Sequence, residues 1–440
     1  MDERHPLERL LAPFTSTPIA DGPGEGDPVW LTSGDWRIFA RPRRDAVAEG
    51  AEIESFRLSD GSVIRARWDE ELGAVSVPFS LAEAYENYVS ERWRTGTRVK
   101  QLTANQLSLF YRVRRLMPRR LQLSLRRALV RWQGLPEFPV WPLDESVLRL
   151  VRFYAKCLLL AGDEEELRFR WFWPDGYRAA LILTHDVESE EGLRLALRLA
   201  DAEEERGFRS SFNIVTSWYS IDFGIVRELQ ERGFEIGLHG VFHDRSMFSS
   251  RIAFDAQQPA LEEATERFQA EGFRSPSTYR VFEWLADLPV SYDCSIPHSD
   301  PFEPQPGRCC SVWPFFIGDV VELPYTLPQD HTLFTLLRHR SPDLWLRLLE
   351  RIEEMNGLAQ VLAHPDPGYM GNERNRALYT EFLDRASEHA HLWTALPRDV
   401  GRWWRERDAG ESEQWRMTVG TFRLERGSGE LVLEPQAAYL

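Results

Sequence analysis

Long apolar runs and a basic, apolar leader are both missing from this sequence of 440 residues. A membrane-spanning helix needs about 18 or more consecutive, predominantly apolar residues, and the chain contains no such run. The segment from Met1 to Leu7 lacks the basic n-region and the following apolar stretch of a secretory signal peptide. We therefore expect a cytoplasmic protein without a membrane span.

The sequence also has few cysteines, and its net charge is negative. The four cysteines include no C-x-x-C pair, which favours reduced thiols over a disulfide framework. The formal net charge is -16, whereas phosphate contacts require clustered Lys and Arg. These features argue against a disulfide-stabilised secreted domain and against broad nucleic-acid binding.

The pattern of the sequence divides the chain into three regions. Residues 1–177 indicate mixed strands and helices, and residues 406–440 indicate a β-hairpin. Between them, residues 178–405 alternate apolar strands with helices, and Gly follows most of the helices closely. Such alternation predicts βα units with parallel strands. We expect an α/β protein with a distorted (β/α)7-type barrel, an N-terminal α+β region and a small C-terminal β appendage.

One segment of the N-terminal region, residues 99–135, contains no Asp or Glu. Its arginines are interleaved with apolar residues, which predicts basic amphipathic helices broken at Pro118. Two interpretations stay open. The segment is either a surface that contacts an anionic lipid or an anionic glycan carrier, or a solvated helical face packed on an acidic neighbour.

Polar residues gather where three of the predicted apolar strands end. Asp186 and Glu188 follow the first strand, His239 and His243 follow the second, and His364 follows the third. In a parallel βα barrel the functional groups lie at the carboxyl ends of the strands. The three strand ends therefore predict one cluster of carboxylates and imidazoles on a single rim.

The spacing within this cluster is typical of a metal site. Two histidines plus one carboxylate form a common open coordination set for a catalytic ion. Asp186 and Glu188 are two residues apart, so an extended backbone presents both carboxylates to the same face. One of them can bind the ion while the other stays free as a base, and Arg274 is the candidate for a nearby cation. The competing interpretation, histidines that only complete the core or the surface, stays open.

Together these motifs resemble those of the NodB-type polysaccharide deacetylases, carbohydrate esterase family 4. The family's acidic pair, H-x-x-x-H motif, R-x-P motif and late histidine are matched in order by Asp186-Val187-Glu188, His239 to His243, Arg274-Ser275-Pro276 and Leu362-Ala363-His364. The resemblance covers about half of the chain. Two departures matter: Glu188 replaces the usual Asp, and the fourth motif lacks its usual Asp-Trp character.

The resemblance implies a role for each residue. The catalytic residues would be Asp186, His364, Arg274 and Asp293, and the metal ligands would be Glu188, His239 and His243. Asp186 would be the base, oriented by Arg274, and His364 would be the acid. Asp293 is our candidate for the acid that tethers the late histidine. One divalent ion is expected, Zn²⁺ first, with Co²⁺, Mn²⁺ or Ni²⁺ as alternatives.

The activity implied by the resemblance is removal of an N-acetyl group from an N-acetylated carbohydrate, an intermediate of cell-envelope or glycan biosynthesis. Two alternatives stay open. One is an amidohydrolase that acts on a non-sugar linear or cyclic amide, and the other is a catalytically silent barrel that binds glycan. The segment Trp313 to Phe334, rich in Pro, Asp and Glu, is interpreted as either a wall of the cleft or a strand with a structured loop.

Overall fold

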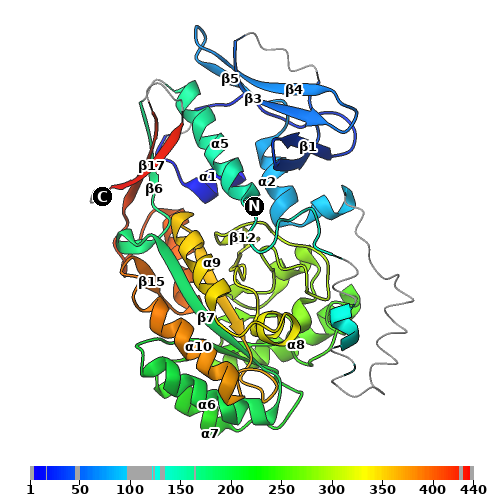
Figure 1. Cartoon of the computed structure of the whole chain (residues 1–440), viewed down its shortest axis with the longest axis vertical. Coiled ribbons are helices and arrows are strands. Elements are labelled where there is room, and N and C mark those ends of the chain that lie inside the picture. The colour runs from blue at the N-terminus through cyan, green and yellow to red at the C-terminus, as the bar shows by residue number, and fades with distance from the viewer. Residues whose placement is uncertain are drawn as a thin grey trace.

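The computed structural model describes residues 4–15, 17–44, 50–96, 121, 124–128, 134–162, 165–425 and 430–436. In this part of the chain the strands form three sheets, of five, nine and three strands. The five-stranded sheet lies at one end of an elongated molecule, and the nine-stranded sheet with its helices forms the bulk of the other end (Figure 1). None of the described helices combines the length and the apolar character that a bilayer crossing requires.

The N-terminal region is built on an antiparallel sheet with the strand order β2-β1-β3-β4-β5. Its strands are β1 (Val29–Ser33), β2 (Trp36–Ala40), β3 (Ala51–Leu58), β4 (Val63–Asp69) and β5 (Ala74–Ser76), and its helices are α1 (Pro6–Leu11), α2 (Leu81–Val89), the 3₁₀ helix η1 (Arg92–Gly96) and α5 (Ser146–Ala161). Phe153 of α5 contacts Trp36 and Phe56 of the sheet, with ring centroids 5.8 and 5.9 Å away. Helix α5 therefore covers the apolar face of this sheet.

The large sheet has the strand order β12-β13-β11-β10-β9-β8-β7-β14, and β15 also pairs with β7. Its strands are β7 (Ala179–Val187), β8 (Ser211–Ile214), β9 (Glu235–Leu238), β10 (Gly272–Phe273), β11 (Tyr292–Asp293), β12 (Phe315–Ile317), β13 (Val320–Glu322), β14 (Leu358–Ala363) and β15 (Leu392–Thr394). Among the described residues, the paired strands of this sheet run parallel, except β12 with β13. Every residue of β7 is buried, as expected of a central strand covered on both faces.

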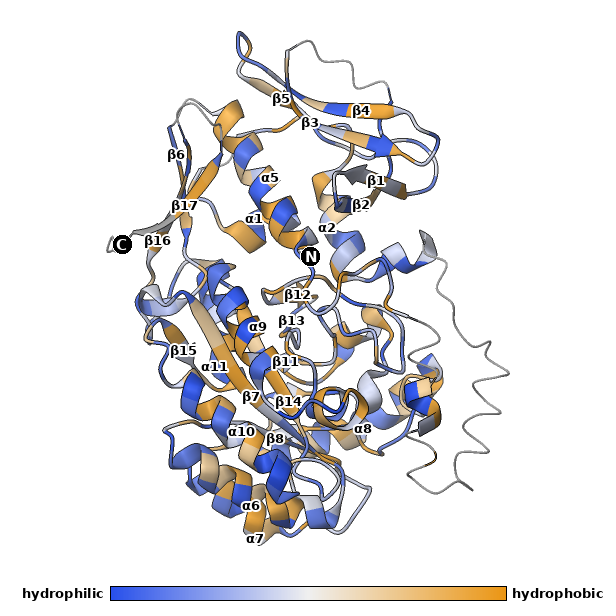
Figure 2. Ribbon diagram, in the orientation of Figure 1, coloured by the Kyte–Doolittle hydropathy of each residue, from blue (hydrophilic) through white to orange (hydrophobic). Residues whose placement is uncertain are grey.

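Helices follow the strands and pack against the sheet. They are α6 (Glu190–Glu204), α7 (Phe223–Glu231), α8 (Arg251–Phe268), α9 (Asp343–Glu354), α10 (Glu373–Ala386) and α11 (Pro397–Ala409). Shorter turns are η2 (Pro174–Gly176), η3 (Pro276–Thr278), η4 (Phe282–Asp287) and η5 (His331–Leu336). Side chains of Ser189, Ser250 and Asn372 accept backbone N–H bonds at the starts of α6, α8 and α10. Figure 2 shows that the strands are largely hydrophobic and lie inside, whereas the helices outside them carry both hydrophobic and hydrophilic residues.

The sheet is curled and open, because its strand order ends at β12 on one side and at β14 on the other. An extended segment after β13 bridges this opening. The Thr326 hydroxyl donates to the carbonyl of Leu358 over 2.8 Å, and the Leu327 amide donates to the carbonyl of Gln360 over 3.2 Å. The expected α/β class is confirmed, whereas the expected (β/α)7-type barrel is found only as a curled, open, largely parallel sheet. The strands of the sheet differ in length and direction. Strands β10 and β11 have only two residues each, and β12 runs antiparallel to β13.

The third sheet joins the segment just before the barrel to the C-terminal end of the described chain. Strand β6 (Glu166–Arg170) pairs antiparallel with β16 (Val419–Leu424), which pairs antiparallel with β17 (Leu431–Gln436). The C-terminal hairpin is thus not a separate unit, because it completes a sheet that the N-terminal region begins. Phe422 stacks on Phe169 with ring centroids 5.1 Å apart, which anchors the pairing in the core.

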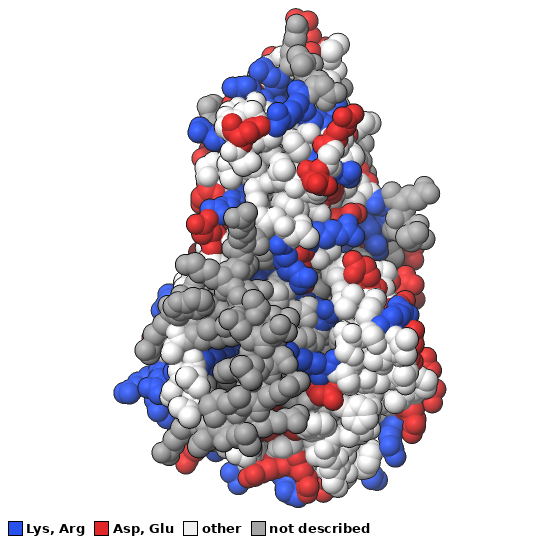
Figure 3. All heavy atoms as spheres, turned by 90° about the vertical axis from the view of Figure 1, so that its right-hand side faces the viewer, with Lys and Arg blue, Asp and Glu red and all other residues white. Residues whose placement is uncertain are grey.

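Most of the basic segment 99–135 lies outside the described residues. Two of its arginines are described, and both donate to backbone carbonyls of the barrel. Arg126 donates to Phe302 over 2.7 Å, and Arg127 donates to Thr335 over 2.7 Å. Among the described residues of the face in Figure 3, positive and negative side chains are interspersed. These contacts lend no support to the anionic carrier suggested for this segment.

Glu235, the first residue of β9, is a buried acid that makes stability depend on pH. Tyr292 donates a hydrogen bond to its Oε1 over 2.7 Å, and the Arg398 amide donates to its Oε2 over 3.1 Å. Burial outweighs these bonds and raises the pKa of Glu235 to about 7. An acid whose pKa is raised on folding stabilises the protein at low pH, and this contribution is lost as the pH rises towards 7.

We expect Glu235→Gln to remove part of that pH dependence. Since one pKa unit corresponds to about 1.4 kcal/mol, the free energy of unfolding of the parent should lose roughly 3 kcal/mol between pH 4.5 and 7 through this group. The measurement is urea unfolding at pH 5 and pH 8. The exposed Glu231 provides the control, Glu231→Gln. Equal slopes with pH in the two variants would refute this assignment.

Candidate metal centre and active site

The carboxyl edge of the parallel sheet collects the residues expected in the site. Asp186 is the penultimate residue of β7, and Glu188 follows that strand. His239 follows β9 directly, Arg274 follows β10, and His364 follows β14. Since parallel neighbours end at the same edge, these side chains share one rim.

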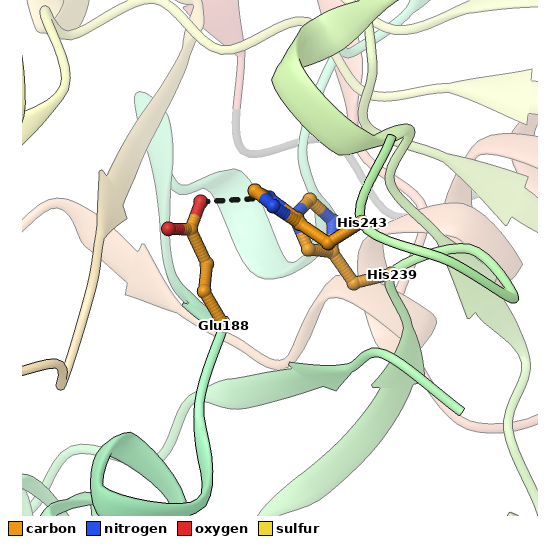
Figure 4. Close-up of side chains that lie close together, drawn as sticks. All are labelled: Glu188, His239 and His243. Atoms are coloured by element: carbon orange, nitrogen blue, oxygen red, sulfur yellow. Dashed lines mark ion pairs between the residues drawn. The ribbon is translucent and has the colours of Figure 1, made fainter. Parts of the chain in front are cut away.

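Glu188, His239 and His243 form a cluster with the composition of a metal site. One ligand atom from each of the three lies within 4.8 Å of the others. Glu188 Oε1 is 2.9 Å from His243 Nε2 (Figure 4). Figure 4 shows the carboxylate reaching in from the end of β7 and both imidazoles from the segment after β9.

The hydrogen bond of His239 fixes its tautomer. His239 Nδ1 lies 2.9 Å from the carbonyl oxygen of Arg274, which can only accept, so Nδ1 carries the hydrogen. Its Nε2 then presents a lone pair, and this buried atom has no hydrogen-bond partner among the described residues. Metal-binding histidines are oriented by such a bond from the other ring nitrogen. The donor set therefore fits a divalent ion such as Zn²⁺.

The charge states of the cluster also suit a metal. Burial lowers the pKa of His239 to about 4, so the ring is neutral at pH 7. Burial opposes ionisation of Glu188, but the hydrogen bond with His243 and the nearby imidazoles outweigh it and lower the pKa of this carboxyl. Burial likewise opposes protonation of His243, and Glu188 raises its pKa. Because a metal binds the neutral imidazole, a bound cation would compete with protonation of His243.

Asp186 lies beside this cluster as an ionised carboxylate. Its Oδ1 accepts a bond of 2.9 Å from the Asn213 amide and one of 3.2 Å from Arg274 Nη1. Its Oδ2 is 3.7 Å from His239 Nε2. Burial raises the pKa of Asp186, but His239 and Arg274 outweigh burial, so the net shift is downward. Asn213 was not predicted from the sequence; its only signal is an amide within the short, buried strand β8.

Arg274 is fully buried and has partners on several sides. Its Nε donates to the carbonyl of Cys294 over 2.9 Å, and its Nη1 donates to the Thr184 hydroxyl over 2.8 Å. The amide of Gln360 is best oriented with its oxygen on Arg274 Nη2 and its nitrogen on the carbonyl of Leu323. The guanidinium is thus held rigidly against Asp186, in the place expected for it.

His364 is held by Asp330. The ring nitrogen Nδ1 lies 2.7 Å from Asp330 Oδ1, and the backbone amide of His364 donates to Asp330 Oδ2 over 3.0 Å. Burial lowers the pKa of His364, but Asp330 and then Glu188 and Asp186 outweigh it and raise the pKa to about 10. His364 is therefore a protonated imidazole, with Nε2 3.7 Å from Glu188 Oε1.

Asp293 does not occupy the tethering place that the sequence suggested. It ends β11, where its carboxylate accepts a bond of 2.6 Å from the Ser295 hydroxyl. Glu322, its partner in the register of β13, lies beside it, and burial raises the pKa of both acids. The acid on His364 is Asp330. It belongs to the segment 313–334, whose density of polar residues was its only signal in the sequence.

Asp366 is a further residue of the site that sequence reasoning left without a role. Its carboxylate accepts a bond of 3.1 Å from the Glu188 backbone amide and a bond from the Ser189 hydroxyl. Ser189 in turn caps helix α6. Asp366, two residues after His364, thereby fixes the backbone of Glu188.

Comparison with solved structures finds deacetylases among the similar ones. A protein from Mycobacterium smegmatis classed as a polysaccharide deacetylase is 18% identical, with a TM-score of 0.43, over 55% of this chain and 94% of its own. Puue allantoinase is 16% identical, with a TM-score of 0.41, over 53% and 92%. A family 4 carbohydrate esterase from Streptomyces lividans is 12% identical, with a TM-score of 0.34, over 50% and 93%. No family model and no curated protein matches the sequence.

Proposed function

We propose that this protein is a metal-dependent hydrolase that removes the N-acetyl group from an N-acetylated sugar. One observation carries the proposal. The cluster of Glu188, His239 and His243 has an ionised carboxylate, Asp186, on one side and a protonated imidazole, His364, on the other. Hydrolysis of an amide needs a base for the attacking water and an acid for the leaving nitrogen, and this arrangement supplies both.

Glu188, His239 and His243 would hold the ion. A divalent ion supplies Lewis-acid polarisation of the amide carbonyl and lowers the pKa of water to about 7. Zn²⁺ is our first choice, because two imidazoles and one carboxylate form an open set that it commonly takes. The lone pair of His239 Nε2 has no other partner among the described residues, which supports this use of the cluster.

The chain's own residues move the protons. Asp186 takes a proton from the water that attacks the amide carbon, while Asn213 and Arg274 hold its carboxylate in place. His364 gives its proton to the nitrogen as the carbon–nitrogen bond breaks. The products are acetate and a free amine. Asp330 keeps His364 protonated and directs Nε2 towards the centre.

A sugar substrate is favoured by the resemblance of the motifs and by one aromatic side chain. Trp218, after β8, is 50% exposed, and its ring centroid lies 6.3 Å from that of His243. Flat aromatic faces of this kind suit the apolar face of a sugar ring. An amidohydrolase acting on a non-sugar amide remains the second candidate, because the same catalytic groups would serve it.

We expect purified protein to contain about one divalent ion per chain and to release acetate from N-acetylglucosamine oligomers. His239→Ala and His243→Ala should each lose most of the metal and the activity, since each removes one ligand. The exposed His391 gives the matched control, His391→Ala. Elemental analysis and acetate release are measured together.

The outcomes separate the candidates. Full metal content in both histidine variants would refute the assignment of the ligands. Release of ammonia or amine from linear or cyclic amides, with none from acetylated sugars, would transfer the proposal to the second candidate. Binding of glycan by a metal-free, inactive protein would indicate the silent barrel instead.

A further inference from the structure

Glu91, a residue of the N-terminal region, reaches into the loops that carry the active site. It lies two residues beyond the end of α2 and is only 4% exposed. Its carboxylate accepts a hydrogen bond from Arg280, which is itself fully buried. A Cβ atom at Gly307 would lie 2.5 Å from Glu91 Oε2, so the loop around Gly307 closes tightly over this carboxylate. The pair is a buried charge contact between two parts of the chain.

Arg280 clamps the loop that follows Arg274. Its Nη1 donates to the carbonyl of Thr278 over 2.7 Å, and its Nη2 donates to the carbonyl of Gly307 over 3.1 Å. Ser277 and Thr278 in this loop have φ values of 53° and 55°. Two consecutive non-glycine residues in the left-handed region persist only when their surroundings hold them there. The loop therefore depends on contacts from outside it.

The same loop is linked to the residues on the base side of the site and to those on its acid side. At its start, the carbonyl of Arg274 orients His239, and the guanidinium holds Asp186. At its far side, the Thr278 hydroxyl donates to Glu303 Oε2 over 3.3 Å.

Glu303 extends the path to the acid. Its Oε1 accepts a hydrogen bond from the Gln329 amide, and Gln329 immediately precedes Asp330. Asp330 in turn holds His364. A continuous chain of hydrogen bonds and one peptide link thus connects Glu91 to the loop beside the base Asp186 and, through Glu303, to Asp330, which holds the acid His364.

We propose that Glu91 is a positioning residue of the active site, which acts through Arg280 on the loop 275–281 and on the segment that carries Asp330. The catalytic meaning of this inference rests on the proposed function. The coupling of Glu91 to the two segments can be tested without that function. The N-terminal region is, on this account, part of the catalytic unit rather than a separate module.

Glu91→Gln alone leaves the Arg280 guanidinium buried without its charge partner, which strongly destabilises a protein. The informative variant is therefore Glu91→Gln combined with Arg280→Met, which removes both charges. If the pair only joins two parts of the chain, the double variant should behave like the parent once it is folded. If Arg280 positions the loop, the double variant should be stable and still defective at the site.

Two measurements on the full chain decide the question. Hydrogen exchange of the metal-free protein is followed in the peptides covering 275–281 and 329–336, and Zn²⁺ affinity is measured by chelator competition. We expect faster exchange in both peptides and roughly 10-fold weaker Zn²⁺ binding, since residues that orient metal ligands typically contribute 10–100-fold to affinity. The exposed Glu86 on α2 gives the control, Glu86→Gln, which should leave both readouts unchanged.

A folded double variant with parental exchange in both peptides and parental Zn²⁺ affinity would overturn the inference. A parent chain that binds neither Zn²⁺ nor Co²⁺, Mn²⁺ or Ni²⁺ would refute the proposed function, and the exchange measurement alone would then decide whether Glu91 controls the two loops. Faster exchange confined to residues near 91 would also count against the proposal, because a local contact would explain it.

Discussion

Asp186→Asn is expected to lower the rate of amide hydrolysis by a factor on the order of 10²–10⁴ while the metal stays bound. The carboxylate takes the proton from water, and the amide that replaces it cannot do so. Asn fits the same space between Asn213 and Arg274, so the fold and the ligand cluster should persist. The measurements are kcat/KM for acetate release and the metal content of the same sample.

Glu188 is the matched comparison for this prediction, because it lies two residues away on the same rim. Glu188→Gln should weaken metal binding first, and excess ion should restore part of the activity. Glu188→Asp returns the residue that most members of the resembled family carry and tests the length of the ligand. If Asp186→Asn loses the ion while Glu188→Gln keeps it, the two roles must be exchanged.

Asp330→Asn is expected to produce the second large effect, a loss on the order of 10²–10⁴ in rate at alkaline pH. The pKa of His364 is raised to about 10 chiefly by Asp330, acting against burial. Without the carboxylate the pKa should fall towards the ordinary value of about 6.5, so the acid is lost as the pH rises through that lower value. In a pH profile measured between pH 6 and 10, the rate of the variant should therefore fall above about pH 6.5, where the parent stays active.

The control for this prediction is Asp293→Asn. Asp293 was the tether expected from the sequence, whereas the structure places it beside Glu322 and Ser295. Its pKa is raised by burial, so a neutral side chain suits the position. If the rate of this variant falls at the same alkaline pH as that of the parent, while the rate of Asp330→Asn falls at a lower pH, Asp330 is the acid that acts on His364. The reverse result would restore the original assignment.

The sequence was informative where a polar residue directly follows a regular strand. Glu188, His239 and His364 were placed correctly on one rim, because parallel strands end at the same edge. The alternation of strands and helices likewise predicted the parallel sheet. The order of the strands, the opening between β12 and β14, and the pairing of β6 with β16 depend on contacts between distant segments.

The residues that escaped prediction lie where no such pattern exists. Asp330 follows an irregular, extended segment, and nothing in its local sequence indicates that this segment lies against β14. Asn213 is a single amide in a short buried strand. Glu91 contacts Arg280, which lies 189 positions further along the sequence, and no local sequence pattern indicates a contact over that separation.

The three-stranded sheet has a consequence for the order in which the protein folds during synthesis. Strand β6 is made before the barrel, but β16, its partner in this sheet, follows only after the whole barrel. At translation rates of about 5–20 residues per second, β6 would wait roughly 10–50 seconds for β16. During that interval Phe169 lacks Phe422, and the strand presents an unpaired edge of the kind that invites association with other chains. A nascent chain arrested within the barrel should therefore bind chaperones through this strand.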